Sequence, residues 1–423
     1  METHILQSLR DKNRCSGTCP QNRSHPTHTF EDEDDDDDEN ENEAPCGGSS
    51  HLSNRTNNFY LSSVICHLSF SGMNPPHRCW AEIDLGGLAA NLGQLRQRVA
   101  PEVQFAAVVK ADAYGHGLQP VAVALRDQVD LFAVANAREG EEIRRAGVET
   151  PVMILGPAFS EEVPIIVRQR FIPTLSTAEE GRRLAELVSG SPLDVHFVFD
   201  TGMGRIGLWN GEVIKEFRGL TELAQIRVTA LSSHLPVADE DREYTSAQLE
   251  RFRREAEQLS ETLPGTILNS AGLLRFGQTA RPGDVVRTGL ALYGICPLPE
   301  FQSLFRPVLS WKTRVVLVRM LQAGRTLSYG RTFTTSRETK VATIGAGYGD
   351  GYLRHLSNAG AEVLIQGRRC PVLGRVTMDQ TMVDVTGLPG LNVGDEVVLI
   401  GRQGNEEILA SELARKAGTI AWE

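Results

Sequence analysis

The sequence predicts an α/β protein: a (β/α)8 barrel of the TIM type followed by a mostly antiparallel β domain. Two patterns carry this prediction. From Ala81 onward, short apolar runs alternate with amphipathic stretches, and eight such runs fall within roughly 210 residues. After Arg306 the runs become shorter and glycine-rich turns separate them, which indicates a separate β domain. The eight barrel runs are residues 103–110, 130–134, 152–155, 171–175, 193–200, 226–233, 266–269 and 284–287.

Segments with helical periodicity lie between these runs. Eight strand–helix units in succession are typical of a barrel, whose functional residues gather at the carboxyl ends of its strands. An open doubly wound sheet is the alternative, but that fold more often carries a GxGxxG sequence after its first strand, and none follows residue 110. The predicted helices include residues 118–126, 137–146, 177–188 and 246–263.

The region after residue 306 predicts short β-strands and one helix. The helix covers residues 411–417, with Ser411 as its expected N-cap. We therefore expect three regions: a disordered acidic extension over 1–72, a cofactor-binding barrel over 73–305 and a β domain over 306–423. The predicted strands of this last region are residues 315–320, 339–344, 363–365, 381–385 and 396–400.

The net charge of -11 is concentrated near the N-terminus. Residues 31–43 alone hold eleven carboxylates, so the remaining sequence is neutral, which argues against a nucleic-acid-binding surface. Residues 1–72 are rich in Ser, Asn, Asp and His and have no periodicity, which predicts disorder. Translation from Met73 is an alternative start.

Neither a metal site nor a membrane segment is expected. Cys15, Cys19, His25 and His28 are residue types that bind metals, but their spacing fits no common zinc finger. Residues 59–70 form too short an apolar run for a membrane helix or a convincing signal peptide.

Cysteine usage predicts a reducing compartment. Only Cys79, Cys296 and Cys370 occur in the patterned part of the chain, and such scattered cysteines suggest no disulfide framework. We therefore expect a cytoplasmic protein.

Lys110 ends an apolar run and is followed by a turn rich in glycine. Burial disfavours an ammonium group, so the pKa of such a lysine falls and its free amine can attack a carbonyl. Pyridoxal phosphate supplies a carbonyl of this kind, and the glycines and Tyr114 downstream suit a phosphate. Taken alone, a lysine at a strand end more often has no catalytic role.

Several motifs resemble those of alanine racemases, which are pyridoxal-phosphate enzymes built from a barrel and a β domain. The sequence Val-Val-Lys-Ala-Asp-Ala-Tyr-Gly-His-Gly at 108–117 resembles the family's cofactor-lysine motif. The resemblance runs from about Trp80 to the C-terminus. Further similar motifs follow in order: Asp-Thr-Gly-Met-Gly-Arg at 200–205, Asn-Ser-Ala at 269–271, Arg-Thr-Gly-Leu at 287–290, Leu-Ser-Tyr-Gly at 327–330 and Met-Asp-Gln at 378–380.

The resemblance implies an alanine racemase, which interconverts L- and D-alanine through a pyridoxal-phosphate aldimine and supplies D-alanine for peptidoglycan. It makes Lys110 the cofactor anchor and one catalytic base, and Tyr329 the second base. Tyr329 and Met378 would enter the active site of a partner subunit, which implies a homodimer with shared sites. The implied cofactor-binding residues are Tyr114, His234, Asn269, Ser270, Arg287, Gly289 and Leu290, and the implied substrate-binding residues are Arg205 and Met378.

Racemisation explains why two bases are needed. The α-proton leaves one face of a planar intermediate and returns to the other, so the bases must lie on opposite sides. A phenol titrates near pH 10, so Tyr329 needs positive charge nearby, and Arg205 is a candidate. The permanent charge of Arg287 at the cofactor's ring nitrogen would keep that nitrogen unprotonated, which limits side reactions such as transamination.

The sequence departs from the family pattern at three places. Val198 occupies the position of a lysine that many relatives carry, Trp422 replaces a phosphate-contacting tyrosine, and the chain ends at Glu423, where relatives usually continue. Three alternatives remain open at this point. They are a broad-specificity or serine racemase, a decarboxylase of the same architecture, which would present a carboxylate instead of Arg287, and a non-catalytic cofactor carrier, which would lack the β domain.

Overall fold

The computed structural model describes residues 64–65, 77–209 and 211–423. The chain divides into two units, Met1–Tyr60 and Leu61–Glu423, and all the described residues lie in the second. The extension predicted over residues 1–72, with Cys15, Cys19, His25 and His28, lies outside the described residues except for 64–65.

The barrel contains the eight predicted strands, all parallel to their neighbours. In the sheet order β10 pairs with β3, and the strands then follow in sequence order to β9. The ring closes where the Arg287 amide of β10 donates at 2.9 Å to the carbonyl of Leu268, two residues after β9 ends. This closure confirms the barrel over the open sheet. The strands are β3 Gln104–Val108, β4 Leu131–Val134, β5 Val152–Ile154, β6 Ile172–Leu175, β7 Leu193–Val198, β8 Ile226–Ser232, β9 Gly265–Thr266 and β10 Val285–Thr288.

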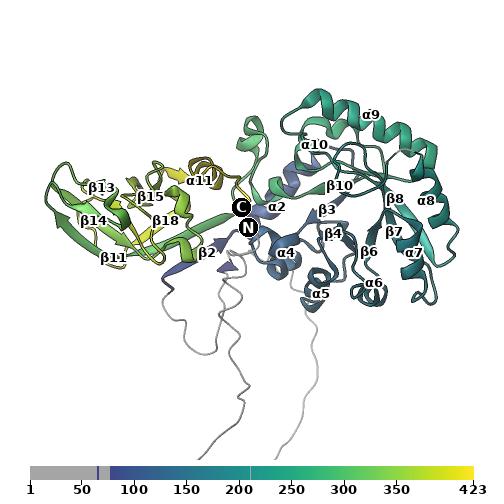
Figure 1. Ribbon diagram of the computed structural model, residues 1–423, viewed down its shortest axis with the longest axis horizontal. Helices are drawn as coiled ribbons and strands as arrows, with labels where there is room; N and C mark the ends of the chain where they lie inside the picture. The colour runs from purple at the N-terminus through teal and green to yellow at the C-terminus, as the bar shows by residue number, and fades with distance from the viewer. Residues whose placement is uncertain (1–63, 66–76, 210) are drawn as a thin grey trace, which may run out of the picture. The chain divides into compact units, whose positions relative to one another are not determined.

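Helices surround the barrel strands (Figure 1). The four predicted helices correspond to α4, α5, α7 and α9, but α9 begins at Arg242, four residues earlier than predicted. Asp241 caps it by accepting a 2.9 Å hydrogen bond from the Tyr244 amide, which fixes the start ahead of the apolar periodicity. The barrel helices are α2 Leu85–Arg96, α4 Leu118–Leu125, α5 Ala137–Arg145, α6 Val163–Gln169, α7 Ala178–Ala185, α8 Glu212–Thr221, α9 Arg242–Leu259 and α10 Ser270–Phe276.

The β domain is built on one long strand, β11 Leu309–Leu321. Its first half pairs with β2 Cys79–Ile83 and with β18 Glu396–Gln403, and its second half pairs with β14 Thr339–Ile344, all antiparallel. The range 73–305, predicted as barrel, therefore includes one strand that is hydrogen-bonded into the other sheet. The remaining strands are β1 Val64–Ile65, β12 Thr326–Leu327, β13 Phe333–Thr334, β15 Glu362–Ile365, β16 Arg368–Pro371, β17 Thr381–Asp384 and β19 Glu406–Ile408.

The predicted C-terminal helix is present as α11 Ala410–Ala417, but Ser411 is not its N-cap. Leu409 occupies the cap position in extended conformation and makes no side-chain cap, so Ser411 falls within the first helical turn. A side-chain network fastens this helix instead.

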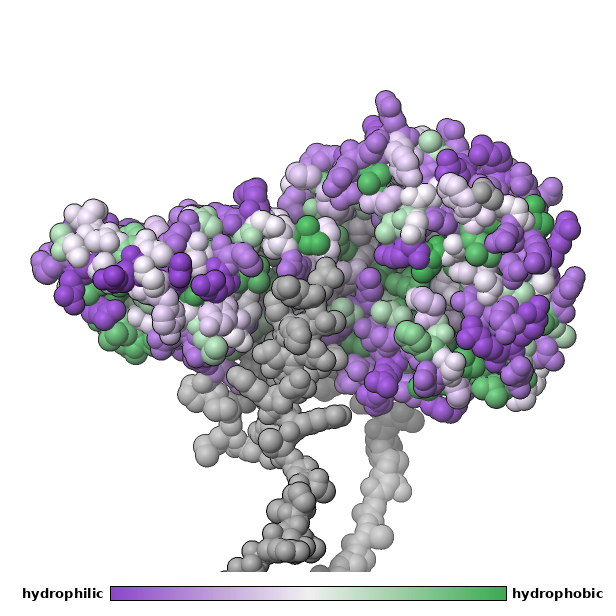
Figure 2. Space-filling view, in the orientation of Figure 1, coloured by the Kyte–Doolittle hydropathy of each residue, from purple (hydrophilic) through white to green (hydrophobic). Residues whose placement is uncertain are grey.

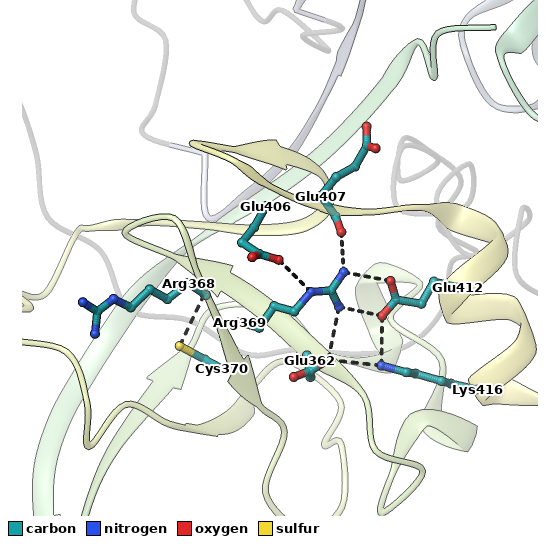
Figure 3. Close-up of polar contacts among 8 residues, drawn as sticks. All are labelled: Glu362, Arg368, Arg369, Cys370, Glu406, Glu407, Glu412 and Lys416. Atoms are coloured by element: carbon teal, nitrogen blue, oxygen red, sulfur yellow. Dashed lines mark hydrogen bonds and ion pairs between the residues drawn. The ribbon is translucent and has the colours of Figure 1, made fainter. Parts of the chain in front are cut away.

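The network centres on Arg369 of β16 (Figure 3). Its guanidinium donates to Glu412 of α11 at 2.8 and 3.0 Å, to Glu362 at 3.1 Å and to Glu406 at 3.0 Å. Lys416 lies 2.9 Å from Glu412. Hydrogen bonds from Arg369 and Lys416 lower the pKa of Glu412 to about 2, so α11 is tied to the sheet by ionised groups.

The surface of the β domain and barrel is mostly hydrophilic on the face shown in Figure 2, with apolar residues scattered among polar ones.

None of the described helices combines the length and the apolar character that crossing a membrane requires. Cys79, Cys296 and Cys370 are free thiols.

Candidate active site

Lys110 lies at the carboxyl end of β3, where the chain enters an unusual turn. The four residues after it, Ala111 to Tyr114, all have φ between 53° and 55°. This is one turn of left-handed helix made without glycine, and it costs roughly 1–2 kcal/mol per residue. Gly115 and Gly117, at φ 79° and 89°, continue in the region that glycine favours.

Hydrogen bonds from outside the turn hold this strained backbone. The carboxylate of Glu139 accepts from the Ala111 amide at 2.8 Å, and that of Asp112 accepts from the Leu118 amide at 2.7 Å. The surrounding structure thus compensates for the strain, which is the condition under which such geometry persists at functional sites.

Four basic side chains interact at the mouth of the barrel. Burial, and then the positive charge of Arg205, lower the pKa of Lys110. Burial and the charges of Arg287, Arg205 and Lys110 lower the pKa of His234 to about 3. The imidazole is therefore neutral at physiological pH, and the cluster attracts anions.

Arg287 is buried among neutral acceptors. It donates through Nη1 to the carbonyl of Thr266 and, at 2.6 Å, to the Thr266 hydroxyl, and through Nη2 to the Ser233 carbonyl at 2.6 Å. Nη2 also donates to Nδ1 of His234 at 3.3 Å. No carboxylate among the described residues pairs with this guanidinium, and burial, with Arg205, lowers its pKa to about 10.

A small neutral cradle lies beside this cluster. The amides of Gly289 and Ala291 point to the hydroxyl of Ser270, at 3.1 and 3.4 Å. A Cβ added to Gly289 would lie 2.8 Å from the phenol oxygen of Tyr114, so this glycine keeps the space open. Burial raises the pKa of Tyr114 to about 12, so its phenol stays protonated and can donate.

These donors fit pyridoxal phosphate. Neutral hydroxyls and amides can bind its phosphate, the amine of Lys110 can bind its carbonyl, and Arg287 offers a donor with no carboxylate partner for a ring nitrogen. The fit rests on the chemistry of the donors and on the space left at Gly289.

Two other predicted cofactor residues have different surroundings. The Asn269 side chain caps α10, accepting from the Gly272 amide at 2.9 Å, and donates to the Leu235 carbonyl at 3.1 Å. Its polar atoms therefore already have partners within the fold. Leu290 is half-buried and follows Gly289 at the start of a short 3-10 turn.

Arg205 lies on the loop 200–207 that follows β7. The carboxylate of Asp200 accepts from the amides of Gly202, Met203 and Gly204 at 2.7–2.8 Å, which folds the loop back on itself. Arg205 is exposed, and it forms no ion pair with the described residues. Its charge nevertheless influences Lys110, His234 and Arg287, so it belongs to the same cluster.

Tyr329 and Met378 lie in the β domain and are not part of this cluster in the single chain. Their side chains are 69% and 55% exposed. Ser328, just before Tyr329, has φ 62° and donates to the Arg375 carbonyl at 2.6 Å, which fixes the turn that presents the phenol.

Sequence reasoning missed Glu139 and Thr266, which hold Lys110's turn and Arg287. Glu139 lies within the predicted helix 137–146 and Thr266 begins the predicted strand 266–269, and only the fold shows which backbone or guanidinium group each one reaches. The described residues contain no group of three or more side chains suited to a metal ion.

Comparison with known proteins agrees with this arrangement. Residues 83–297 match the family model for the N-terminal domain of alanine racemase, and residues 308–423 match the model for its C-terminal domain. The alanine racemase of Symbiobacterium thermophilum is 43% identical over 371 residues, covering 84% of this chain and 95% of the relative. That of Methylacidiphilum infernorum is 40% identical over 356 residues, covering 82% and 90%.

Solved structures give the same result. Alanine racemase from Clostridium difficile 630 superposes with a TM-score of 0.75 at 31% identity, covering 82% of this chain and 93% of that one. Alanine racemase from Bacillus anthracis with bound L-Ala-P has a TM-score of 0.73 at 35% identity, covering 82% and 92%. With both domains matched and the basic cluster in place at the barrel mouth, this chain belongs to the alanine racemase family.

Proposed function

We propose that the protein is an alanine racemase that uses pyridoxal phosphate to interconvert L- and D-alanine. The observation that carries the proposal is the cluster of Lys110, His234, Arg205 and Arg287. In it the pKa of the Lys110 amine is lowered by burial and by the positive charge of Arg205, and neither arginine is paired with a carboxylate of the described residues. The names of the relatives and their similarity over more than 80% of the chain support the same activity.

The cofactor site follows from the neutral cradle. Tyr114, Ser270, Gly289 and Leu290 would hold the phosphate, with Asn269 contributing through its placement of Ser270 at the start of α10. Arg287 would face the ring nitrogen, and His234 would lie against the ring. When bound, pyridoxal phosphate supplies an electron sink that makes the α-proton of an amino acid acidic.

Lys110 provides the first base. Because burial and Arg205 lower the pKa of its amine, a larger fraction is unprotonated at neutral pH, and Nζ can accept a proton on one face of the substrate. Arg205 supplies a positive charge for the substrate carboxylate at the same rim.

Tyr329 provides the second base, from a partner subunit. Its exposure in the single chain, together with that of Met378, supports a homodimer in which each subunit's β domain completes the other's site. A proton delivered from the tyrosine side reaches the face opposite Lys110, which inverts the configuration of the α-carbon.

We also propose a cytoplasmic location and a role in supplying D-alanine for peptidoglycan. The free thiols of Cys79, Cys296 and Cys370 are compatible with a reducing compartment.

The test uses the purified full chain with pyridoxal phosphate and L-alanine in deuterated water. We expect loss of optical rotation together with deuterium at the α-carbon, and slower or no turnover of L-serine. Equal or faster turnover of L-serine would favour the broad-specificity alternative. No exchange with either amino acid, despite cofactor bound to Lys110, would favour a carrier protein and contradict the proposal.

A further inference from the structure

Helix α9 reaches the Arg205 loop with three side chains on one face. The hydroxyl of Tyr244 donates to the Gly202 carbonyl at 2.9 Å, and Arg251 donates to the Thr201 carbonyl at 3.1 Å. Between them, Nε2 of Gln248 donates to the Thr201 hydroxyl at 3.0 Å. Tyr244, Gln248 and Arg251 are four and three positions apart, so they lie on the same side of α9, and all three donate hydrogen bonds to the loop.

Gln248 has a second partner outside the loop. Its Nε2 also donates to the carbonyl of His234 at 2.8 Å. The Gln248 side chain is only 2% exposed, and the Thr201 hydroxyl that it contacts is fully buried and lies 2.8 Å from the hydroxyl of Ser233. One amide group thus joins the loop that carries Arg205 to the residue that accepts a hydrogen bond from Arg287.

The loop needs such an external anchor. Gly202, Gly204 and Gly207 have φ of 148°, 70° and 93°, and glycine, which has no side chain, restrains the backbone of the loop least. The Asp200 carboxylate holds the amides of Gly202, Met203 and Gly204, and the Asp200 amide donates to the Leu208 carbonyl at 2.7 Å, but all of these bonds lie within residues 200–208. Arg205 itself forms no ion pair with the described residues. The place of the guanidinium therefore depends on how the loop backbone is held.

We infer that Gln248 is a positioning residue for substrate binding, which acts by fixing the loop of Arg205 against the His234 segment. Tyr244 assists from the rim of the same helix. The inference rests on the proposed function, in which Arg205 binds the carboxylate of the amino acid. Gln248 touches neither substrate nor cofactor in this role.

A purely structural role for Gln248 makes a different prediction. General loosening of the barrel would weaken every ligand to a similar degree. A positioning role through Arg205 affects only ligands that present a carboxylate to Arg205.

The test compares two ligands in the cofactor-loaded full chain. L-alanine carries the carboxylate, and L-alaninol has the same skeleton with a hydroxymethyl group in its place. In Gln248→Met, which keeps similar bulk but cannot donate, we expect KM for L-alanine and its dissociation constant to rise about tenfold, the equivalent of one lost hydrogen bond. Binding of L-alaninol should change less than about twofold, and Gln258→Met, at an exposed glutamine of the same helix, should behave as the unmodified protein.

Two further measurements do not depend on turnover. Amide hydrogen exchange in residues 200–207 should be faster in Gln248→Met. In a double-mutant cycle, Gln248→Met should add little to the loss of alanine binding already caused by Arg205→Ala, because both act on one contact. If Gln248→Met does not fold, Tyr244→Phe at the half-exposed rim should give the same pattern with a loss of about threefold.

Equal weakening of L-alanine and L-alaninol, or additive losses with Arg205→Ala, would overturn the inference. So would unchanged alanine binding in Gln248→Met. If instead the unmodified protein fails to racemise L-alanine, the proposed function fails, and that outcome is seen before any variant is made.

Discussion

Nη2 of Arg287 donates a hydrogen bond to Nδ1 of His234 across 3.3 Å, so this nitrogen carries no proton. A guanidinium can only donate, and a neutral imidazole then keeps its proton on Nε2. The pair sets one tautomer of His234. It places a buried arginine beside a half-buried histidine without a described carboxylate between them.

Buried histidines are expected to make the protein sensitive to mild acid. Burial and then Arg287 lower the pKa of His196 to about 4, and burial with Arg287, Arg205 and Lys110 lowers that of His234 to about 3. In the unfolded chain both titrate near 6.5, so below this pH the unfolded state binds protons that the folded state does not. Stability should therefore fall as pH drops from 6.5 to 4, by up to about 1.4 kcal/mol per pH unit for each histidine.

The measurement is the thermal midpoint between pH 7.5 and 4.5. His196→Gln should flatten this slope, whereas His355→Gln, at an exposed position of the β domain, should leave it unchanged. Parallel slopes for His196→Gln and the unmodified protein would contradict the assignment.

Removal of the Arg205 charge should raise the pKa of the Lys110 amine. After burial, Arg205 is the next cause of its lowering, so Arg205→Gln should shift the amine's titration toward higher pH. The pH dependence of trace acetylation of Lys110 in cofactor-free protein measures this directly. Arg254→Gln, at an exposed arginine of α9, serves as the control, and an unshifted curve for Arg205→Gln would refute the interaction.

Replacement of Tyr329 by phenylalanine should remove one of the two bases. We expect kcat to fall by at least about 100-fold in both directions while the cofactor stays bound, because proton transfer by a positioned base contributes at least this much. Steady-state rates and the cofactor absorption band are the readouts. Full activity would remove Tyr329 from the mechanism.

Shared sites can be tested by mixing two inactive proteins. Lys110→Ala and Tyr329→Phe chains should regain roughly a quarter of normal activity after subunit exchange, since half the dimers would be hybrids, each with one complete site. Absence of recovery, with exchange verified by mass spectrometry, would argue that each site is built from one chain.

The Arg369 network should contribute measurably to the stability of the β domain. Arg369→Met leaves Glu362, Glu406 and Glu412 without their common partner, and Glu412 is only 17% exposed, so we expect a loss of about 2 kcal/mol in the free energy of unfolding. Denaturant unfolding measures it. The contribution of the depressed Glu412 pKa exists above about pH 4.5 and should disappear as pH falls toward 2.

Arg402→Met, at an exposed arginine of β18 in the same sheet, is the matched control. An equal effect in both variants would mean that the network adds nothing beyond surface charge.

The barrel could be predicted because its parallel strands are buried on both faces and read as continuous apolar runs. The first half of β11 could not. Its partner β2 lies more than 200 residues earlier in the chain, and the local sequence of either strand does not identify so distant a pairing partner. The Ser411 cap was wrong for a related reason: the position of α11 depends on Arg369, a contact between separate elements.

Within the site, motifs identified Lys110, His234, Arg205 and Arg287, and burial together with the positive charges among them lowers the pKa of Lys110, Arg287 and His234. They did not predict the left-handed turn after Lys110, since alanine, aspartate and tyrosine disfavour positive φ and only tertiary contacts impose it. They also did not predict Gln248, which looks like any polar residue of a surface helix until its buried face is known.

The membership of β2 in the second sheet limits how the protein can be divided. The polypeptide passes between the two sheets twice, once from β2 into α2 and again on entering β11. A C-terminal fragment that begins between the two family-model matches, after residue 297 and before 308, would lack β2. The backbone groups of residues 309–313 that pair with β2 would then form an open sheet edge, which is prone to aggregation. An independent C-terminal module would therefore need circular permutation, with residues 79–83 grafted back beside β11.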